Sequence, residues 1–176
     1  MKTHSEISPL IDDAACVLLE ELQKDARIST AELARRAGLS PSATAERVRR
    51  LEDAGVIRGY HAEIDPACLG LGIMAIIRMT CDGAQYSQFM TYLKSCEQIR
   101  ECYHVTGGDA LMMKVLVGTV EELESLVMKL LRYGVPTTSL VLSSPLVRTG
   151  YDIRPALAGR TGKAKDGKDG AAGRRV

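Results

Sequence analysis

The sequence predicts an α+β protein in two parts, three helices at the N-terminal end followed by a β-α-β-β-α-β unit. Two observations support this prediction. From residue 8 to residue 55, apolar residues recur at spacings of three and four, as on the buried face of a helix. From residue 71 to residue 147, apolar and β-branched runs alternate with two amphipathic stretches. With 176 residues, the chain is long enough for each part to bury an apolar core.

Start and stop signals divide the first part into three helices. Ser29 opens a capping box, and Gly38 follows the helix of about two turns that begins there. Ser40 at the N-cap with Pro41 at the first helical position opens another helix. Gly55 stands where a left-handed C-terminal residue is expected. The last two helices are therefore separated by a tight glycine turn.

The stretch after the third helix is short and β-prone. Residues 56–64 read VIRGYHAEI, and Asp65-Pro66 then marks a turn. We therefore predict a wing or small hairpin at residues 56–64.

The pattern of the second part, residues 71–147, predicts a ferredoxin-like, split β-α-β domain. Its expected elements are a strand at 71–80, a helix at 86–96, strands at 99–105 and 110–117 around a hairpin at 106–109, a helix at 121–132 and a strand at 137–147. A four-stranded sheet with helices on one face leaves its other apolar face to be covered, so we expect a homodimer. Ile73, Ala75 and Ile77 are the candidates for that covered face.

Composition shifts mark the boundaries between the parts. The predicted domains are a helical domain at 8–60, a hinge at 61–70, the ferredoxin-like domain at 71–153 and a basic tail at 154–176. The tail is rich in Gly, Ala, Lys, Asp and Arg and has almost no large apolar residue, so we expect it to be disordered.

Several classes of protein are disfavoured by the composition. With no Trp and a single Phe, the chain has little from which to build a stacking platform for single-stranded nucleic acid. No apolar run approaches the ~18 residues that span a bilayer, and the first residues lack the zones of a signal peptide, so we expect a cytoplasmic protein. Five widely spaced Cys and three scattered His offer no metal-ligand or catalytic pattern. We predict no metal, cofactor or catalytic residue.

The two short helices joined at a glycine turn predict a helix-turn-helix domain that binds double-stranded DNA. Residues 35–58 hold six Arg against three acidic residues. The second helix of such a motif enters the major groove with its N-terminal residues nearest the base edges. The expected DNA-binding residues are Arg36, Ser40, Pro41, Ser42, Ala43, Thr44, Arg47 and Arg50.

These positions have different expected roles. Ser42, Ala43 and Arg47 are the candidates for base contacts, and a guanidinium at Arg47 can bind guanine O6 and N7 together. Arg36 and Arg50 are better placed for phosphate. The alternative is that the arginines form a solvated face, paired with neighbouring acidic residues.

The stretch from about residue 18 to residue 70, LLEELQKDARISTAELARRAGLSPSATAERVRRLEDAGVIRGYHAEIDPACLG, resembles the DNA-binding half of the Lrp/AsnC family of transcription regulators. The following unit, with VTGGDALMMKV and YGVPTTSLVL, is similar to that family's effector-binding and oligomerisation domain. The resemblance implies a homo-oligomer, a dimer or a higher assembly, that binds an amino acid between dimers near the loop joining the second and third strands.

That loop supplies the expected effector site. Glycines let backbone N–H groups approach a ligand carboxylate, and a nearby carboxylate can hold an α-ammonium group. The candidate effector-binding residues are His104, Thr106, Gly107, Gly108, Asp109, Ala110 and Thr138. The loop also reads as a plain hairpin turn, and His104 as a partly exposed strand residue.

The sequence departs from the family pattern in this region. The family commonly carries an acidic residue where this chain has Ala110, and Asp109 lies one residue earlier. A one-residue shift in an extended strand points the side chain to the opposite face. Leu140 stands at a position that is often Thr. A less polar effector, or none, is therefore an open alternative.

Two other functions remain to be weighed against an effector-gated regulator. The first is an architectural DNA-binding protein that needs no ligand, which the basic tail supports through sequence-independent affinity for DNA. The tail also reads as a solubilising end. The second is an enzyme on the ferredoxin-like unit, for which no nucleophile, base or metal cluster is visible in the sequence.

Overall fold

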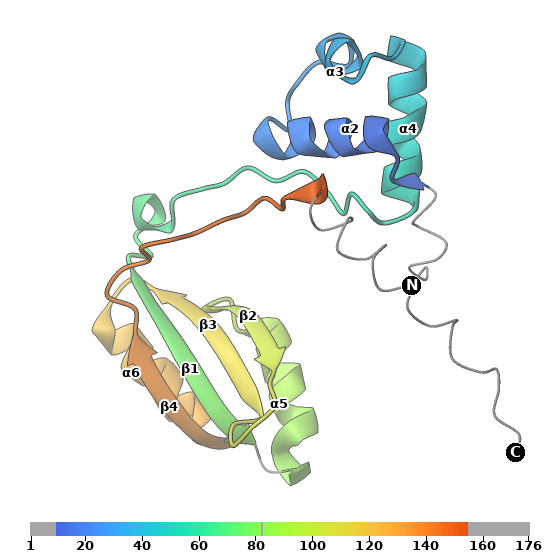
Figure 1. Ribbon diagram of the computed structural model, residues 1–176. Coiled ribbons are helices and arrows are strands. Elements are labelled where there is room, and N and C mark those ends of the chain that lie inside the picture. Colours follow the sequence, from blue (N-terminus) through green and yellow to red (C-terminus); the bar gives the residue numbers. More distant parts are fainter. Residues whose placement is uncertain (1–9, 82, 155–176) are drawn as a thin grey trace, which may run out of the picture. The chain divides into compact units, whose positions relative to one another are not determined.

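The computed structural model describes residues 10–81 and 83–154 (Figure 1). These residues form two compact units. The first unit contains residues 10–62 together with 148–154, and the second contains residues 63–147. The predicted basic tail, apart from its first residue, lies outside the described residues. The return of residues 148–154 to the first unit differs from the expected division, which placed 71–153 in one domain.

The first unit has the three predicted helices, α2 (Asp13–Lys24), α3 (Thr30–Ala37) and α4 (Pro41–Asp53). Each helix begins at a polar N-cap whose side chain accepts a hydrogen bond from the backbone N–H of the third helical residue, which satisfies a donor that the helix leaves unpaired. The caps are Asp12, Ser29 and Ser40. The helices pack around a small apolar core.

The turn between α3 and α4 has the backbone that a helix-turn-helix requires. Gly38 ends α3 at φ +67°, a left-handed conformation that glycine adopts without strain. Leu33 and Ala34 of α3 are buried, and so are Thr44 and Leu51 of α4. The inner faces of both helices are thereby buried in the first unit, and the N-terminal turn of α4 is left at the surface.

The predicted wing is not formed. Residues 56–65 contain no strand, although Val56 and Ile57 pack against the core of the first unit. Gly59 interrupts the β-prone run at φ +153°. The segment ends in a short 3-10 helix, η2 (Pro66–Leu69), capped by the Asp65 side chain. Extended residues without a partner strand therefore replace the hairpin.

The second unit confirms the β-α-β-β-α-β order. Its elements are β1 (Ile73–Cys81), α5 (Gly83–Ser95), β2 (Ile99–His104), β3 (Leu111–Val117), α6 (Val120–Leu130) and β4 (Gly134–Leu140). The strands form one antiparallel sheet in the order β2-β3-β1-β4. Both helices lie on the same face of the sheet, behind the strands in Figure 1.

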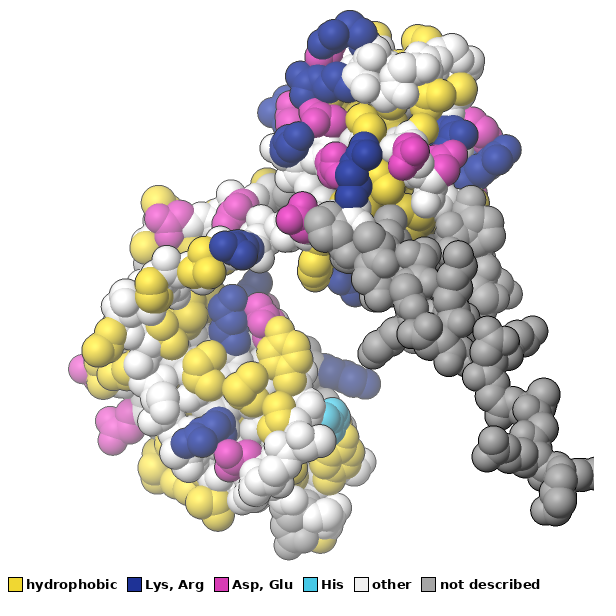
Figure 2. All heavy atoms as spheres, viewed as in Figure 1, with side chains coloured by type: hydrophobic (Ala, Val, Ile, Leu, Met, Phe, Trp, Pro, Cys, Tyr) yellow, Lys and Arg dark blue, Asp and Glu magenta, His cyan; other side chains and the backbone are white. Residues whose placement is uncertain are grey.

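Strict alternation along β1 and β3 separates the two faces of the sheet. Ala75 and Ile77 are fully buried in the core beneath α5 and α6. The expectation that Ala75 and Ile77 lie on the open face, where a second copy would cover them, is therefore wrong. The strand register turns their side chains to the helix side. The open face carries Met74 and Ile76 of β1 instead, with Met112 of β3 among their neighbours. Figure 2 shows apolar side chains over the strands on this face, among a few charged ones.

The last strand begins earlier and ends earlier than the sequence suggests. β4 starts at Gly134, where a Cβ atom would lie 2.0 Å from the carbonyl oxygen of Thr80, so close approach of β1 requires glycine. Pro136 lies within the strand and pairs with Met79. A proline fits there because β4 is an edge strand. Residues 141–147 form no strand.

Among residues 10–81 and 83–154, no helix is long and apolar enough to cross a membrane.

Candidate functional site: DNA-binding surface and effector loop

The start of α4 is an exposed part of the predicted DNA-binding surface. Ser40, Pro41 and Ser42 are exposed, and Ala43 is half-buried. The Ser40 hydroxyl accepts a hydrogen bond from the Ala43 N–H at 3.2 Å and lies 3.2 Å from the Ser42 hydroxyl. Because the N-terminus of a helix carries partial positive charge and free N–H groups, this turn is suited to a phosphate oxygen.

Thr44 is the exception among the predicted positions. Its side chain is fully buried in the first unit, and its hydroxyl has no hydrogen-bond partner. A side chain in that position packs the core and does not reach DNA, so we remove Thr44 from the candidate contacts. The other seven positions stay a prediction.

The arginines of α3 are held by carboxylates. Glu32 binds both Arg35 and Arg36, with the closest approaches at 2.7 Å, and Arg36 also pairs with Glu21 of α2. Hydrogen bonds from Arg35 and then Arg36 lower the pKa of Glu32 to about 2. The Glu32 carboxylate thus binds arginine instead of closing the second half of the capping box.

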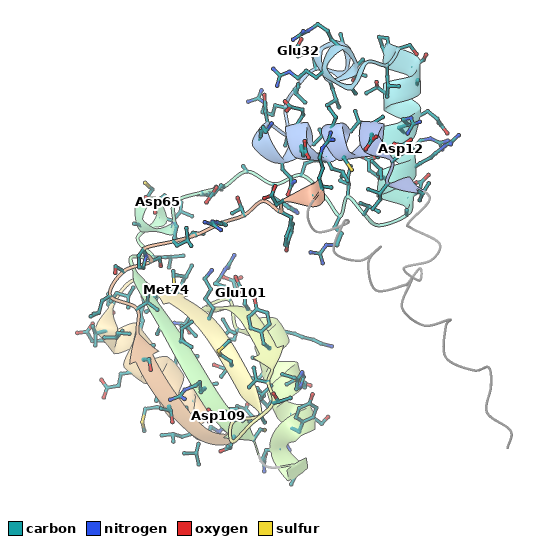
Figure 3. All side chains as sticks on the ribbon, viewed as in Figure 1. Asp12, Glu32, Asp65, Met74, Glu101 and Asp109 are labelled. Carbon is teal, nitrogen blue, oxygen red and sulfur yellow. The ribbon has the colours of Figure 1, made fainter. Side chains whose placement is uncertain are left out.

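Arg47 is held by Asp12, the N-cap of α2. One guanidinium nitrogen of Arg47 lies 2.7 and 2.9 Å from the two carboxylate oxygens of Asp12. Figure 3 shows Asp12 where α2 begins, beside α4. The Ala15 N–H and the Arg47 guanidinium lower the pKa of Asp12. Both side chains are partly exposed, and exposed ion pairs contribute little to the free energy of folding. Arg47 can therefore exchange this carboxylate for another acceptor.

The remaining arginines of α4 share one acidic partner. Glu46 lies 3.0 Å from Arg49 and 3.0 Å from Arg50. All five arginines of α3 and α4 are therefore paired with a carboxylate in the first unit. This arrangement agrees with the alternative of an ion-paired face, and it means that DNA phosphates must replace protein carboxylates around these side chains.

The predicted effector loop connects β2 to β3 at one end of the sheet. The Val105 N–H donates to the Ala110 carbonyl at 3.1 Å, which closes the loop, and the Ala110 N–H donates to the Met79 carbonyl at 3.2 Å. Gly107 has a φ of +118°, which only glycine adopts readily. Thr106, Gly107 and Gly108 are exposed, so their backbone groups are accessible to a ligand.

Asp109 points to the open face of the sheet. Its carboxylate lies 3.6 Å from Arg78 of β1, and it is labelled at the end of the strands in Figure 3. Thr138 of β4 pairs with Ile77, whose side chain is buried on the helix side, whereas Thr137 pairs with Arg78. The structure therefore places Thr138 on the opposite face from Asp109 and places Thr137 on the same face.

His104 also lies away from Asp109. It ends β2 opposite Leu111, a residue buried on the helix side of the sheet. Its Nε2 atom is 2.7 Å from the Tyr86 hydroxyl on α5. The seven predicted effector residues therefore do not share one surface. The Asp109 side chain lies on the open face of the sheet beside the loop, whereas the His104 and Thr138 side chains lie on the helix side.

Sequence reasoning missed two partners that the fold brings to these sites. Asp12 had a local signal, because it precedes the first apolar helical run and suits an N-cap. Arg78 is the single charged residue in the run LGIMAIIRMT, and a charge in a buried strand indicates a partner. Within the part of the chain that the structure describes, no cluster of His, Cys, Asp or Glu could hold a metal ion.

The two units together define a class of protein, helix-turn-helix regulators that carry a ferredoxin-like ligand-binding domain. Residues 16–58 match the winged helix-turn-helix DNA-binding family, and residues 74–151 match the Lrp/AsnC ligand binding domain. The chain is 34% identical over 140 residues to the HTH-type transcriptional regulator LrpC of Bacillus subtilis, which covers 80% of this chain and 97% of LrpC. The chain therefore belongs to the Lrp/AsnC family and is a DNA-binding transcription regulator.

Solved structures agree with this assignment. The LrpC structure matches with a TM-score of 0.74 at 33% identity, over 78% of this chain and 99% of that one. A feast or famine regulatory protein from M. tuberculosis, complexed with L-methionine, matches with a TM-score of 0.74 at 33% identity, over 80% and 97%. A transcriptional regulator–L-Met complex from Neisseria meningitidis matches with a TM-score of 0.77 at 26% identity, over 83% and 99%.

The Asp12–Arg47 pair predicts an acid-sensitive contribution to the stability of the first unit. Because the folded-state pKa of Asp12 is below its ordinary 3.8, the carboxylate stabilises the fold above about pH 4, and the contribution disappears as pH falls through the folded value. Asp12→Asn keeps an N-cap side chain and removes the ion pair. We expect a loss of about 1 kcal/mol or less at pH 7 that vanishes at low pH.

Thermal melting of the full chain across this pH range measures the effect. Asp13→Asn, the same charge change at the neighbouring exposed position outside this ion pair, is the matched control. A difference between Asp12→Asn and the parent that is constant with pH would contradict the assignment.

Proposed function

We propose that this regulator reads specific DNA sites with the N-terminal half of α4, as a homodimer or higher oligomer in the cytoplasm. An amino acid or related metabolite that binds beside the loop at 105–110 modulates it. The observation that carries the proposal is the exposed first turn of α4, with Ser40, Pro41 and Ser42 at the surface and Arg47 one turn further on. The relatives are named as transcriptional regulators, which supports a regulator that is not an enzyme.

Arg47 is the candidate that tests sequence readout. Its guanidinium must leave Asp12 to reach a base, and a bidentate contact to guanine repays that exchange. Arg47→Ala is expected to weaken binding to a preferred site by about 1 to 3 kcal/mol and to lower the preference over random DNA. The preferred site is first selected from a random duplex pool, and affinities are then measured by fluorescence anisotropy.

Arg132→Ala, a loss of an exposed arginine from the second unit, serves as the control for charge. Equal weakening on selected and random DNA would assign Arg47 to phosphate and contradict base readout.

The open face of the sheet supports the homodimer. Met74, Ile76, Met112 and Leu116 lie on it and are only half-buried in the single chain. Its charged groups are paired within the unit, Arg78 with Asp109 and Lys114 with Glu101. An apolar face whose charges already have partners can be covered by a second copy without leaving a charge unpaired.

Ile76→Asp tests this interface, because it places an unpaired carboxylate at the centre of the face. We expect the full chain to be a dimer or larger at micromolar concentration and the variant to be a monomer with unchanged circular dichroism. Light scattering coupled to size exclusion gives the mass. Leu142→Asp, at a 95% exposed position outside the sheet, is the control. A variant that keeps its mass would overturn the interface.

The effector proposal follows from the loop and from the relatives that bind L-methionine. Exposed backbone N–H groups at Gly107 and Gly108 suit a carboxylate, and Asp109 suits an ammonium group. Because Arg78 already holds Asp109 at 3.6 Å, the ligand must share or replace this ion pair. The same pairing favours the second candidate function, an architectural DNA-binding protein without an effector.

A thermal-shift screen of the twenty amino acids and related metabolites separates the two functions. A ligand that binds the native state raises the melting temperature, and Asp109→Asn is expected to abolish that rise. Glu97→Gln, an exposed carboxylate in the turn before β2, is the control. A flat screen would favour the architectural function.

A further inference from the structure

The outer surface of α6 carries a row of exposed side chains. The helix buries Leu123, Leu126 and Leu130 against the sheet, so its other face points away from the sheet. A shallow hollow of about 500 Å³ lies on that outer surface. Six exposed residues line it, Glu121, Glu124, Ser125, Met128, Lys129 and Arg132. Their successive spacings are three, one, three, one and three residues, which is the spacing of one helix face. We call these six residues the α6 stripe.

The α6 stripe is acidic where it begins and basic where it ends. Glu121 and Glu124 come first, and Lys129 and Arg132 come last. This order suits the helix dipole, which favours acidic residues at the N-terminus and basic residues at the C-terminus. The dipole does not explain Met128, an apolar side chain that is 61% exposed in the middle of the stripe. Methionine is a side chain that adapts readily to a partner surface.

Three of the four charged side chains in the stripe have no partner within the chain. Among residues 10–81 and 83–154, Glu124, Lys129 and Arg132 make no salt bridge and no side-chain hydrogen bond. The open face of the same sheet differs, because Arg78 pairs there with Asp109. The α6 stripe therefore holds charges of both signs that a partner can pair.

The spacing makes the α6 stripe complementary to itself. A two-fold axis through the midpoint of the stripe, between residues 126 and 127, pairs residues that are equally far from that point. Glu124 of one copy then faces Lys129 of the second copy. Glu121 faces Arg132 in the same way, and Met128 of each copy lies beside the axis. A parallel arrangement would instead place like charges opposite each other, which is unfavourable.

We propose that the α6 stripe is a self-association surface, through which two copies of this chain pair their α6 helices antiparallel. The proposal extends the proposed homodimer, because the open face of the sheet forms the dimer and the stripe joins one dimer to another. The two surfaces lie on opposite sides of the sheet, so both can be covered at once. A single helix pair with exposed ion pairs is a small and weak interface, so it forms at protein concentrations above the micromolar range.

Charge reversal in the full chain tests this surface. Glu124→Lys places lysines opposite each other across the axis, and Lys129→Glu places glutamates there. The double exchange Glu124→Lys/Lys129→Glu restores opposite charges. Glu97→Lys, the same charge change at an exposed position of the second unit, is the control. Sedimentation equilibrium from micromolar to millimolar concentration gives the masses, and circular dichroism melting checks that each protein is folded.

At the high end of the concentration range, we expect the parent and the control to have about twice the mass of either single variant, because a two-fold interface joins units in pairs. The double exchange is expected to recover the parent's mass. An equimolar mixture of the two single variants is expected to recover it too, since the lysines of one chain then face the glutamates of the other. Salt at about 0.5 M screens exposed charges and is expected to lower the parent's mass.

Several results would overturn the proposal. If the parent has the same mass as both single variants, any association uses another surface. If the double exchange and the mixture both keep the mass of the single variants, the helices do not pair antiparallel. The proposed homodimer is tested separately, because Ile76→Asp lowers the mass at micromolar concentration, where the α6 contact is not formed. Failure of one interface is therefore distinguishable from failure of the other.

Discussion

The antiparallel pairing of β1 with β3 on one side and β4 on the other is the constraint on which the second unit depends. It assigns alternate residues of β1 to the helix side and to the open side, which decides what the core contains and what a second copy can cover. It also brings the loop at 105–110 beside the end of β1, where the Ala110 N–H binds the Met79 carbonyl. The Arg78–Asp109 pair exists because of that register.

The same pairing places the two connections to the DNA-binding unit side by side. β1 begins and β4 ends at neighbouring positions, and the Val141 N–H donates to the Met74 carbonyl at 2.9 Å. The chain therefore leaves for and returns from the second unit at adjacent points. Residues 148–154 return to the first unit, so two stretches of the chain connect the units instead of one.

Charge pairing shapes the DNA-binding unit in a similar way. An arginine three or four residues after a glutamate lies on the same face of a helix and can pair with it. Arg49 and Arg50 pair with Glu46 in this way. Asp12 and Arg47 meet only because α2 crosses near α4. Exposed ion pairs of both kinds contribute little free energy. The arginine side chains can therefore exchange their carboxylate partners for DNA phosphates. The basic surplus of the chain lies in its last 22 residues.

The sequence by itself determined the three N-terminal helices and the β-α-β-β-α-β order, because caps, glycine stops and apolar periods act over a few residues. It placed Ser29, Gly38 and Ser40 correctly at helix ends. It did not determine which face of β1 is buried, since a one-residue change of register reverses that face and only the pairing with β3 and the two helices fixes it. For the same reason, Thr137 rather than Thr138 shares a face with Asp109.

Only the tertiary structure decided the contacts between distant residues. The hairpin expected at 56–64 is absent because β-propensity needs a partner strand, and within residues 10–81 and 83–154 no strand pairs with this segment. The Gln23 side chain accepts a hydrogen bond from the Tyr151 N–H, and the two residues are 128 residues apart, so no local pattern could join them. Local chemistry therefore fixed the parts of this regulator, while strand register and long-range packing fixed which side chains share a surface.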